Sequence, residues 1–258
     1  MRQPKFLYKY INSEGLLNIL KNLSIKCSPA VLFNDPFDCT PPFLFSKDCD
    51  KNCIIINKYG SSCEGYIKSV SEKCYVSCFT TNPCNILMWG HYTDSYRGGV
   101  IKFKRDIFML KHTQKVNYSN HVQTISSEQC FSNSVGNTNN KTLHELLYLN
   151  KSNCWKYEQE WRFCSHIYSL KNELSIIDLN TINDPIQKKK INKLRKALNK
   201  NNVIIPIINN DIDEIYIGFR NEQIDRIRNI LEQNRITAKV YVVKPENNSY
   251  VLKRERLL

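Results

Sequence analysis

The stretch Trp155-Lys-Tyr-Glu-Gln-Glu-Trp-Arg-Phe-Cys164 is the densest aromatic and charged segment of the chain, and its second half has the character of a strand. Side chains alternate between the two faces of a strand. We therefore expect Glu158, Glu160 and Arg162 on one face and Trp161 on the opposite, packed face. Two carboxylates on one face repel each other, so one of them has a raised pKa or a cationic partner, and Arg162 is placed to be that partner.

Such a carboxylate pair is suited to two kinds of chemistry. It can transfer protons, or it can stabilise positive charge that develops on a sugar. The alternative is a solvated strand face with a surface ion pair, which is common in proteins. Enclosure by Trp155, Tyr157 and Trp161 favours a partly buried pair, so Glu160 and Glu158 are candidate catalytic residues.

Hydrophobic patterns on either side of this segment predict the other elements. Apolar and β-branched runs predict strands at 6–10, 24–27, 74–79, 100–103, 115–118, 203–207, 214–219 and 238–243. Apolar stripes predict helices at 13–23, 85–92, 142–149, 186–202 and 222–234, the first of them capped by Ser13. Residues 40–72 and 126–140 are weakly patterned. The prediction is a single α+β domain at residues 1–245, with mixed or antiparallel sheets packed against short helices, followed by a basic C-terminal tail at 246–258.

Composition limits the class of protein. The chain has 258 residues, 41% of them apolar and 24% charged, which excludes a wholly disordered or fibrous protein. The longest apolar run, 203–208, is far shorter than the ~20 residues that span a bilayer, and no signal peptide is recognisable. We expect a cytoplasmic protein without membrane contacts. The net charge of +13 favours a polyanionic partner such as nucleic acid, although lysine-rich codon usage would produce the same excess.

The 11 cysteines show no metal-binding pattern. Six of them fall between Cys49 and Cys84, without a CxxC pair and without a histidine among them. Structural zinc sites normally contain that close pair, so no metal is expected. The odd count and the missing signal peptide favour reduced thiols that pack as small apolar side chains.

Phe33-Asn-Asp-Pro-Phe-Asp38 is a turn flanked by aromatic residues. Asn and Asp side chains fix turns by bonding to the backbone, and proline fixes φ. One interpretation is a rigid turn held by two buried phenylalanines. The other is that Asn34, Asp35 or Asp38 faces a hydroxyl or amide of a ligand.

Met88-Trp-Gly-His-Tyr92 places two further candidates on a short helix before a glycine-rich turn. His91 is suited to proton transfer, and Tyr92 is suited to stacking on a planar ring. The alternatives are a hydrogen-bonded, half-buried histidine and a tyrosine that fills the core.

The predicted helix at 186–202 carries seven lysines and arginines and no acidic residue. Ile191, Leu194 and Leu198 form its apolar stripe. The basic side chains are either a solvated surface or a phosphate-binding face, which would supply affinity without sequence specificity. The candidate nucleic-acid contacts are Lys188, Lys189, Lys190, Lys193, Arg195 and Lys196.

Taken in order, these pieces resemble a bacterial family known only as a domain of unknown function. The resemblance runs from about residue 6 to residue 243 and rests on five segments. These are Leu7–Tyr10, Phe33–Asp38, Cys78–Phe79, Met88–Tyr92 with the following Gly98-Gly99, and Trp155–Arg162.

The same layout more remotely resembles ADP-ribosyltransferases, including the bacterial toxins that modify DNA. The resemblance implies a split-sandwich fold and NAD as a substrate, without a metal. It implies Glu160 as the catalytic glutamate with Glu158 as its partner, and Tyr92 as the aromatic that stacks on nicotinamide. Lys9 stands where those enzymes usually carry His or Arg. The residues expected to contact NAD are Lys9, Tyr10, Ser28, Asn34, Asp35, Tyr92 and Arg162.

Three hypotheses follow. The first is a transferase that cleaves the nicotinamide–ribose bond and modifies a nucleic acid or protein, as a toxin or anti-phage effector with an antitoxin or defence-system partner. It predicts that Tyr92, Glu158 and Glu160 converge in one cleft beside the first strand. The second is a metal-independent nuclease that uses His91 and Glu160, with His91 bonded to a carboxylate or lysine. The third is a nucleic-acid-binding module, with the two glutamates in solvent or in ion pairs.

Overall fold

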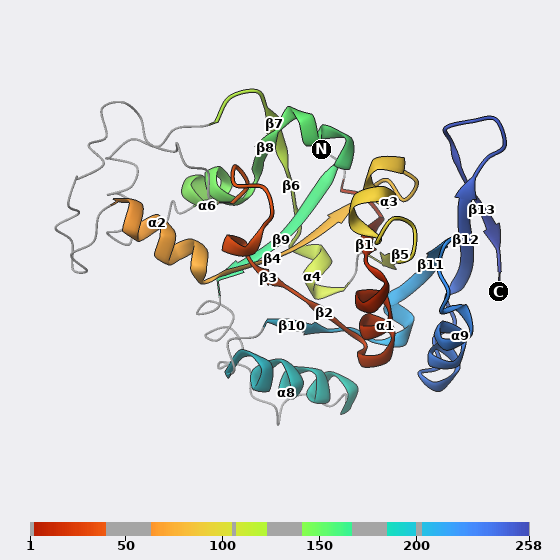
Figure 1. Cartoon of the computed structure of the whole chain (residues 1–258). Coiled ribbons are helices and arrows are strands. Elements are labelled where there is room, and N and C mark those ends of the chain that lie inside the picture. The colour runs from red at the N-terminus through yellow and green to blue at the C-terminus, as the bar shows by residue number, and fades with distance from the viewer. Residues whose placement is uncertain are drawn as a thin grey trace.

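The fold is organised around a large mixed β-sheet (Figure 1), seen in a computed structural model that describes residues 3–39, 63–104, 107–122, 141–166, 185–199 and 203–257. Nine strands form this sheet in the order β13-β12-β11-β5-β1-β4-β9-β6, with β3 paired to β4. The β11–β12 pair is parallel, and the other pairs of this sheet are antiparallel. Two small sheets, β10-β2 and β7-β8, lie beside it.

The strands are β1 (Phe6–Ile11), β2 (Ser24–Lys26), β3 (Ser28–Pro29), β4 (Cys74–Thr80), β5 (Gly99–Lys104), β6 (Gln114–Lys115), β7 (Asn117–Ser119), β8 (Asn150–Ser152), β9 (Glu160–His166), β10 (Ile204–Pro206), β11 (Ile212–Gly218), β12 (Lys239–Pro245) and β13 (Leu252–Arg256). The α-helices are α1 (Ser13–Asn22), α2 (Cys63–Glu72), α3 (Ile86–Tyr92), α4 (Phe108–Lys111), α6 (Lys141–Tyr148), α8 (Pro185–Asn199) and α9 (Ile224–Gln233). Three short 3-10 helices are η1 (Ala30–Leu32), η2 (Asn153–Glu158) and η4 (Asn209–Asp211).

Strand alternation gives the sheet two differently packed faces. Trp161 and Phe163 of β9 are buried in the largest apolar cluster, which also holds buried leucines and isoleucines of α1, α8 and α9. The prediction that Trp161 faces the core is therefore confirmed. The opposite face carries Arg162 and is covered in part by α3, whose Trp89 is fully buried. The charged side chain of Arg162 thus lies on the face of β9 away from the main core.

The N-cap of helix α1 lies one residue before the expected one. The side chain of Asn12 accepts a hydrogen bond from the backbone N–H of Gly15, and so Asn12, not Ser13, caps the helix. Leu16 and Leu20 are fully buried beneath it. Leu23 adopts the left-handed conformation that ends the helix.

The predicted fold class is confirmed as a single α+β domain with a mixed sheet and short helices. One segment differs from its expectation, because 252–256, expected in a tail, form strand β13 and pair with β12. Arg254 of β13 lies over the rings of Tyr216 and Tyr241, and this packing explains why the segment is ordered despite its charge. Residues 40–62 and 123–140 lie outside the described part. The split sandwich stays a prediction.

Among the described residues, no helix is both long enough and apolar enough to cross a membrane. The seven cysteines whose side chains the structure describes are free thiols, and Cys27, Cys39 and Cys74 are buried. Burial raises the pKa of the Cys27 thiol to about 12, so this side chain is a protonated, apolar packing group.

Candidate functional site

A cavity of about 460 Å³ opens where β1 and β4 separate. The two strands share one paired position, Tyr8 with Thr80, and both line the cavity beyond it. The turn after β3, helix α3 and the η2–β9 junction complete the wall. We call this cavity the carboxylate pocket, because its lining includes Asp38, Glu158 and Glu160.

The two glutamates reach the pocket through an irregular joint. Glu158 is the last residue of η2 and Glu160 is the first residue of β9. Between them, Gln159 adopts the left-handed conformation with φ of 47°. The expectation that both glutamates lie on one strand is therefore wrong for Glu158, although both side chains do line the same cavity.

Side chains from distant segments hold this joint in place. The hydroxyl of Thr80 donates to the carbonyl oxygen of Glu158 at 2.5 Å. The backbone N–H of Glu160 donates to the hydroxyl oxygen of Tyr118 at 2.8 Å. Buried backbone groups need such partners, so these two bonds fix the direction in which each carboxylate leaves the chain.

Arg162 holds two of the carboxylates from beneath. Its Nε and Nη2 donate to the two carboxylate oxygens of Glu160 at 2.8 and 2.9 Å, and its Nη1 and Nη2 donate to those of Asp38 at 2.7 and 2.6 Å. Nη1 also donates to the carbonyl oxygen of Tyr148 at 2.9 Å. All five guanidinium protons are therefore used. Arg162 is fully buried and is absent from the pocket lining, so the expectation that it contacts a ligand is wrong, and it orients the acids instead.

Lys151 of β8 is the second cation of this buried cluster. Its Nζ lies 2.6 Å from Glu158, 3.2 Å from Glu160 and 3.5 Å from Asp38. The cluster of Asp38, Lys151, Glu158, Glu160 and Arg162 thus holds three acids and two cations, a net charge of −1 when all are ionised. Burial in a medium of low dielectric makes this pairing obligatory.

The two glutamates have opposite pKa shifts. Burial alone would raise the pKa of Glu160, but Arg162 and Lys151 outweigh burial and lower it to about 2. Burial raises the pKa of Glu158, and the nearby Lys151 offsets only part of that effect. Adjacent carboxyl groups with separated pKa values are typical of acid–base sites, although structural ion pairs also produce them.

Tyr92 connects α3 to the acids. Its hydroxyl donates to Oε1 of Glu158 at 2.5 Å, and its ring lines the pocket. His91 lies at the rim, where its ring meets Tyr92 edge-on at 6.2 Å between centroids. In the part of the chain that the structure describes, His91 has no hydrogen bond to a carboxylate or lysine.

The first strand contributes Lys9 and Tyr10 to the wall. Nζ of Lys9 donates to Oγ of Ser77 at 3.0 Å and to the carbonyl oxygen of Cys78 at 3.2 Å, so it spans the gap between β1 and β4. Burial lowers the pKa of Lys9. The hydroxyl of Tyr10 donates to the carbonyl oxygen of Asn82.

The remaining candidates have different positions. Ser28 and Asn34 line the carboxylate pocket. Asp35 does not, because its Oδ2 accepts from Nε1 of Trp155 at 2.8 Å in a neighbouring cavity. The basic residues of α8 lie on a helix that packs against β10, and none of them lines the pocket. Lys189, Lys193 and Lys196 are exposed there, Lys188 and Arg195 are half-buried, and the side chain of Lys190 lies outside the described part.

Sequence reasoning did not assign Lys151 and Asp38 to the candidate site. Lys151 lies in Asn-Lys-Ser, a stretch without any distinguishing pattern. Asp38 was one of three acceptors in the turn, and nothing in the sequence distinguishes it from Asp35. One signal was available in the sequence: two acids, Glu158 and Glu160, face a single cation, Arg162, so a buried site needs a second cation from elsewhere in the chain.

A family model described as "Protein of unknown function (DUF2971)" matches residues 88–163 of the chain. The matched segment begins within α3 and ends within β9, and it includes Tyr92, Lys151, Glu158, Glu160 and Arg162. The chain is thus similar to this family over the segment that supplies most of the charged cluster. No curated protein and no solved structure matches the chain significantly.

Proposed function

We propose that this protein is an ADP-ribosyltransferase-like enzyme that binds NAD in the carboxylate pocket and cleaves its nicotinamide–ribose bond. The observation that carries the proposal is the convergence of Tyr92, Glu158 and Glu160 in one cavity, with β1 on its wall. Of the three hypotheses, the transferase is the one that requires this arrangement.

The electrostatics of the cluster support this chemistry. In this reaction nicotinamide leaves with the electron pair of the C1′–N bond, and positive charge develops on the ribose. An acceptor O–H or N–H then bonds to C1′ and releases one proton. A buried group of net charge −1 stabilises such a positive centre because it is fixed in advance and shielded from water. Glu160, ionised because of its low pKa, supplies the charge, and Glu158 is suited to receive the proton.

The remaining wall fits the other parts of NAD. The ring of Tyr92 is suited to stacking on nicotinamide. Lys9 and Lys26 line the same cavity and are the cations available for the pyrophosphate. The acceptor is a nucleic acid or a protein. A role as a toxin or an anti-phage effector, with a partner protein, stays a prediction, as does a cytoplasmic location.

Nicotinamide release tests the proposal. Purified protein is incubated with NAD, with and without DNA, RNA and cell lysate, beside the Glu160→Gln and Tyr92→Phe variants. We expect release by the wild type and its loss in Glu160→Gln. Tyr92→Phe keeps the ring but removes the bond to Glu158, so we expect reduced release with a shifted pH profile. Exposed Glu255 on β13 provides the matched control Glu255→Gln, which should behave as wild type.

Absence of release under every condition, from protein with a cooperative melting transition, would overturn the proposal. The nuclease alternative would then need His91 to act on nucleic acid, and His91→Ala would be the variant to assay. The binding-module alternative rests on the ion pairs of Glu158 and Glu160, which it predicts, and on exposed Lys189 and Lys196 of α8. It predicts nucleic-acid binding that Glu160→Gln leaves intact.

A further inference from the structure

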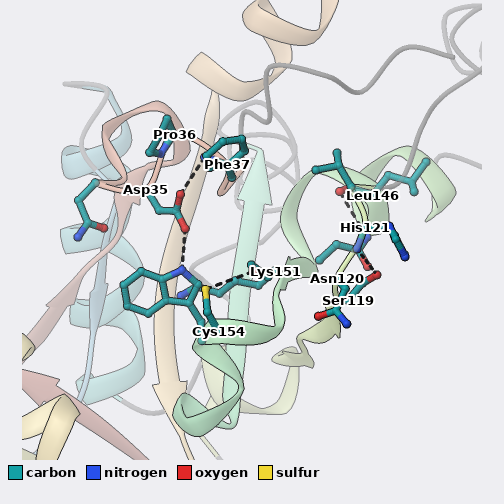
Figure 2. A pocket seen from close by; sticks show the side chains of 14 residues that line it. Asp35, Pro36, Phe37, Ser119, Asn120, His121, Leu146, Lys151 and Cys154 are labelled. Carbon is teal, nitrogen blue, oxygen red and sulfur yellow. Dashed lines mark hydrogen bonds between the residues drawn. The ribbon is translucent and has the colours of Figure 1, made fainter. Parts of the chain in front are cut away.

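A second, larger cavity of about 600 Å³ adjoins the carboxylate pocket (Figure 2). Asn34 and Lys151 line both cavities, so the two share a wall. One side of the second cavity is formed by the turn with Asp35, Pro36 and Phe37, to which Trp155 is hydrogen-bonded, and the other by Ser119, Asn120 and His121 with Leu146. Pockets of about 300–1,000 Å³ are typical of small-molecule sites. We call it the amide pocket, because Asn34, Asn120 and Asn150 line it.

The charged groups in this lining are already paired. Oδ1 of Asp35 accepts from the backbone N–H of Phe37 at 2.9 Å, and Oδ2 accepts from Nε1 of Trp155 at 2.8 Å. Lys151 lies among three carboxylates. Within the described residues, no other acidic, lysine or arginine side chain is in the lining. Among the described lining residues, a charged ligand group would therefore find no unpaired carboxylate, lysine or arginine as a counter-ion, which favours an uncharged group.

The amides offer hydrogen bonds of both directions. Oδ1 of Asn120 accepts from Asn153 at 2.7 Å, which leaves its NH₂ group to donate. The NH₂ group of Asn150 donates to the carbonyl oxygens of Glu145 and Leu146, which leaves its Oδ1 to accept. A ligand that presents both an acceptor and a donor complements these two amides.

Flat apolar surface completes the pocket. Phe37 is 52% exposed although it is a large apolar side chain. Together with the ring of Trp155 it offers surface on which a planar group can stack. Lys156, next to Trp155 in η2, is exposed, and the chain carries a net charge of +13. An exposed cation thus lies next to the pocket-lining Trp155, whereas the interior suits a neutral ring.

We propose that the amide pocket binds an unpaired nucleobase of single-stranded nucleic acid. A nucleobase is neutral, planar and has donors and acceptors on one edge, and its phosphates remain outside the pocket, where Lys156 is exposed. A base inside a duplex has that edge occupied and its faces stacked. The inference of base binding stands on this pocket alone. That the base is also the acceptor, beside the ribose, rests on the proposed function.

Fluorescence anisotropy with the full chain, without NAD, tests the proposal. The probes are a labelled single-stranded oligonucleotide of mixed sequence, the same strand with abasic residues, and a duplex of equal length. Base–aromatic stacking contributes about 1–3 kcal/mol, so we expect Phe37→Ala to weaken binding of the base-containing strand roughly tenfold. Phe219→Ala is the matched control, since Phe219 is a 40% exposed phenylalanine that lines neither cavity. It should change the affinity less than twofold.

Asn120→Ala provides a second variant at an exposed position and should also weaken binding of the base-containing strand. Unchanged affinity in both Phe37→Ala and Asn120→Ala would overturn the proposal. Equal affinity of wild type for the abasic strand or the duplex would overturn it too, because phosphates would then account for binding. These results are independent of nicotinamide release, so failure of this proposal and failure of the proposed function give different outcomes.

Discussion

The cluster around Arg162 and the helix α8 are both rich in charge, but they use it in opposite ways. In the cluster, Asp38, Glu158, Glu160 and Arg162 are between 0% and 4% exposed, and each is paired. On α8, the exposed lysines surround a stripe in which Leu194 is buried. The comparison teaches that the number of charges alone does not mark a site. What distinguishes the cluster is that acids and cations far apart in the sequence meet where water is excluded.

The largest expected effect comes from breaking the cluster at its centre. Arg162→Met would leave Asp38 and Glu160 buried with only Lys151 to compensate them. Removal of one partner from a buried ion pair typically costs about 3–5 kcal/mol of the free energy of unfolding. Lys196→Met on α8 removes an exposed cation and should change it by less than about 0.5 kcal/mol. Denaturant unfolding of both variants measures the two losses of unfolding free energy. Equal losses would contradict the distinction between the buried cluster and α8.

Acid should act on the cluster and not on α8, whose sequence contains no acidic residue. The folded pKa of Glu160 is about 2, below its ordinary value of 4.5, so its ionised form stabilises the fold above about pH 5. That contribution, roughly 3 kcal/mol, is lost as the pH falls from about 5 to 2. Unfolding measured against pH should show this loss in wild type and in the surface variant Glu222→Gln. Glu160→Gln should be less stable at pH 7 and less sensitive to acid; an unchanged acid slope would contradict the ionised state of Glu160.

The smallest expected effect concerns the exposed lysines of α8. If α8 binds phosphates, Lys189→Gln with Lys196→Gln should reduce the salt dependence of single-strand binding by about 0.7 for each phosphate that is no longer neutralised. Neither stability nor nicotinamide release should change, because neither side chain lines the carboxylate pocket. Anisotropy titrations at several salt concentrations measure the slope. A slope equal to that of wild type would leave α8 as a solvated surface.

The local elements of this fold were predictable, and the contacts between distant ones were not. The alternation in Trp161, Arg162 and Phe163 predicts which side of β9 faces the core, because one period of two residues decides it. No local pattern indicates that Asp38 meets Arg162, since that contact joins residues 124 positions apart. The role of Lys151 was hidden for the same reason. Strand β13 was not predicted because its own residues are mostly charged, and the tyrosine rings on which Arg254 packs belong to other strands.

The joint at Gln159 fixes the number of residues between Glu158 at the end of η2 and the charged residues of β9. The pairing of β9 with β4 sets which face Trp161 and Arg162 take, so insertion or deletion of one residue between η2 and β9 would displace Glu158 relative to Glu160 and Arg162. Functional homologues should therefore keep the number of residues between Trp155 and Arg162, together with Glu158, Glu160 and Arg162 themselves, and differ only at the other positions of this segment.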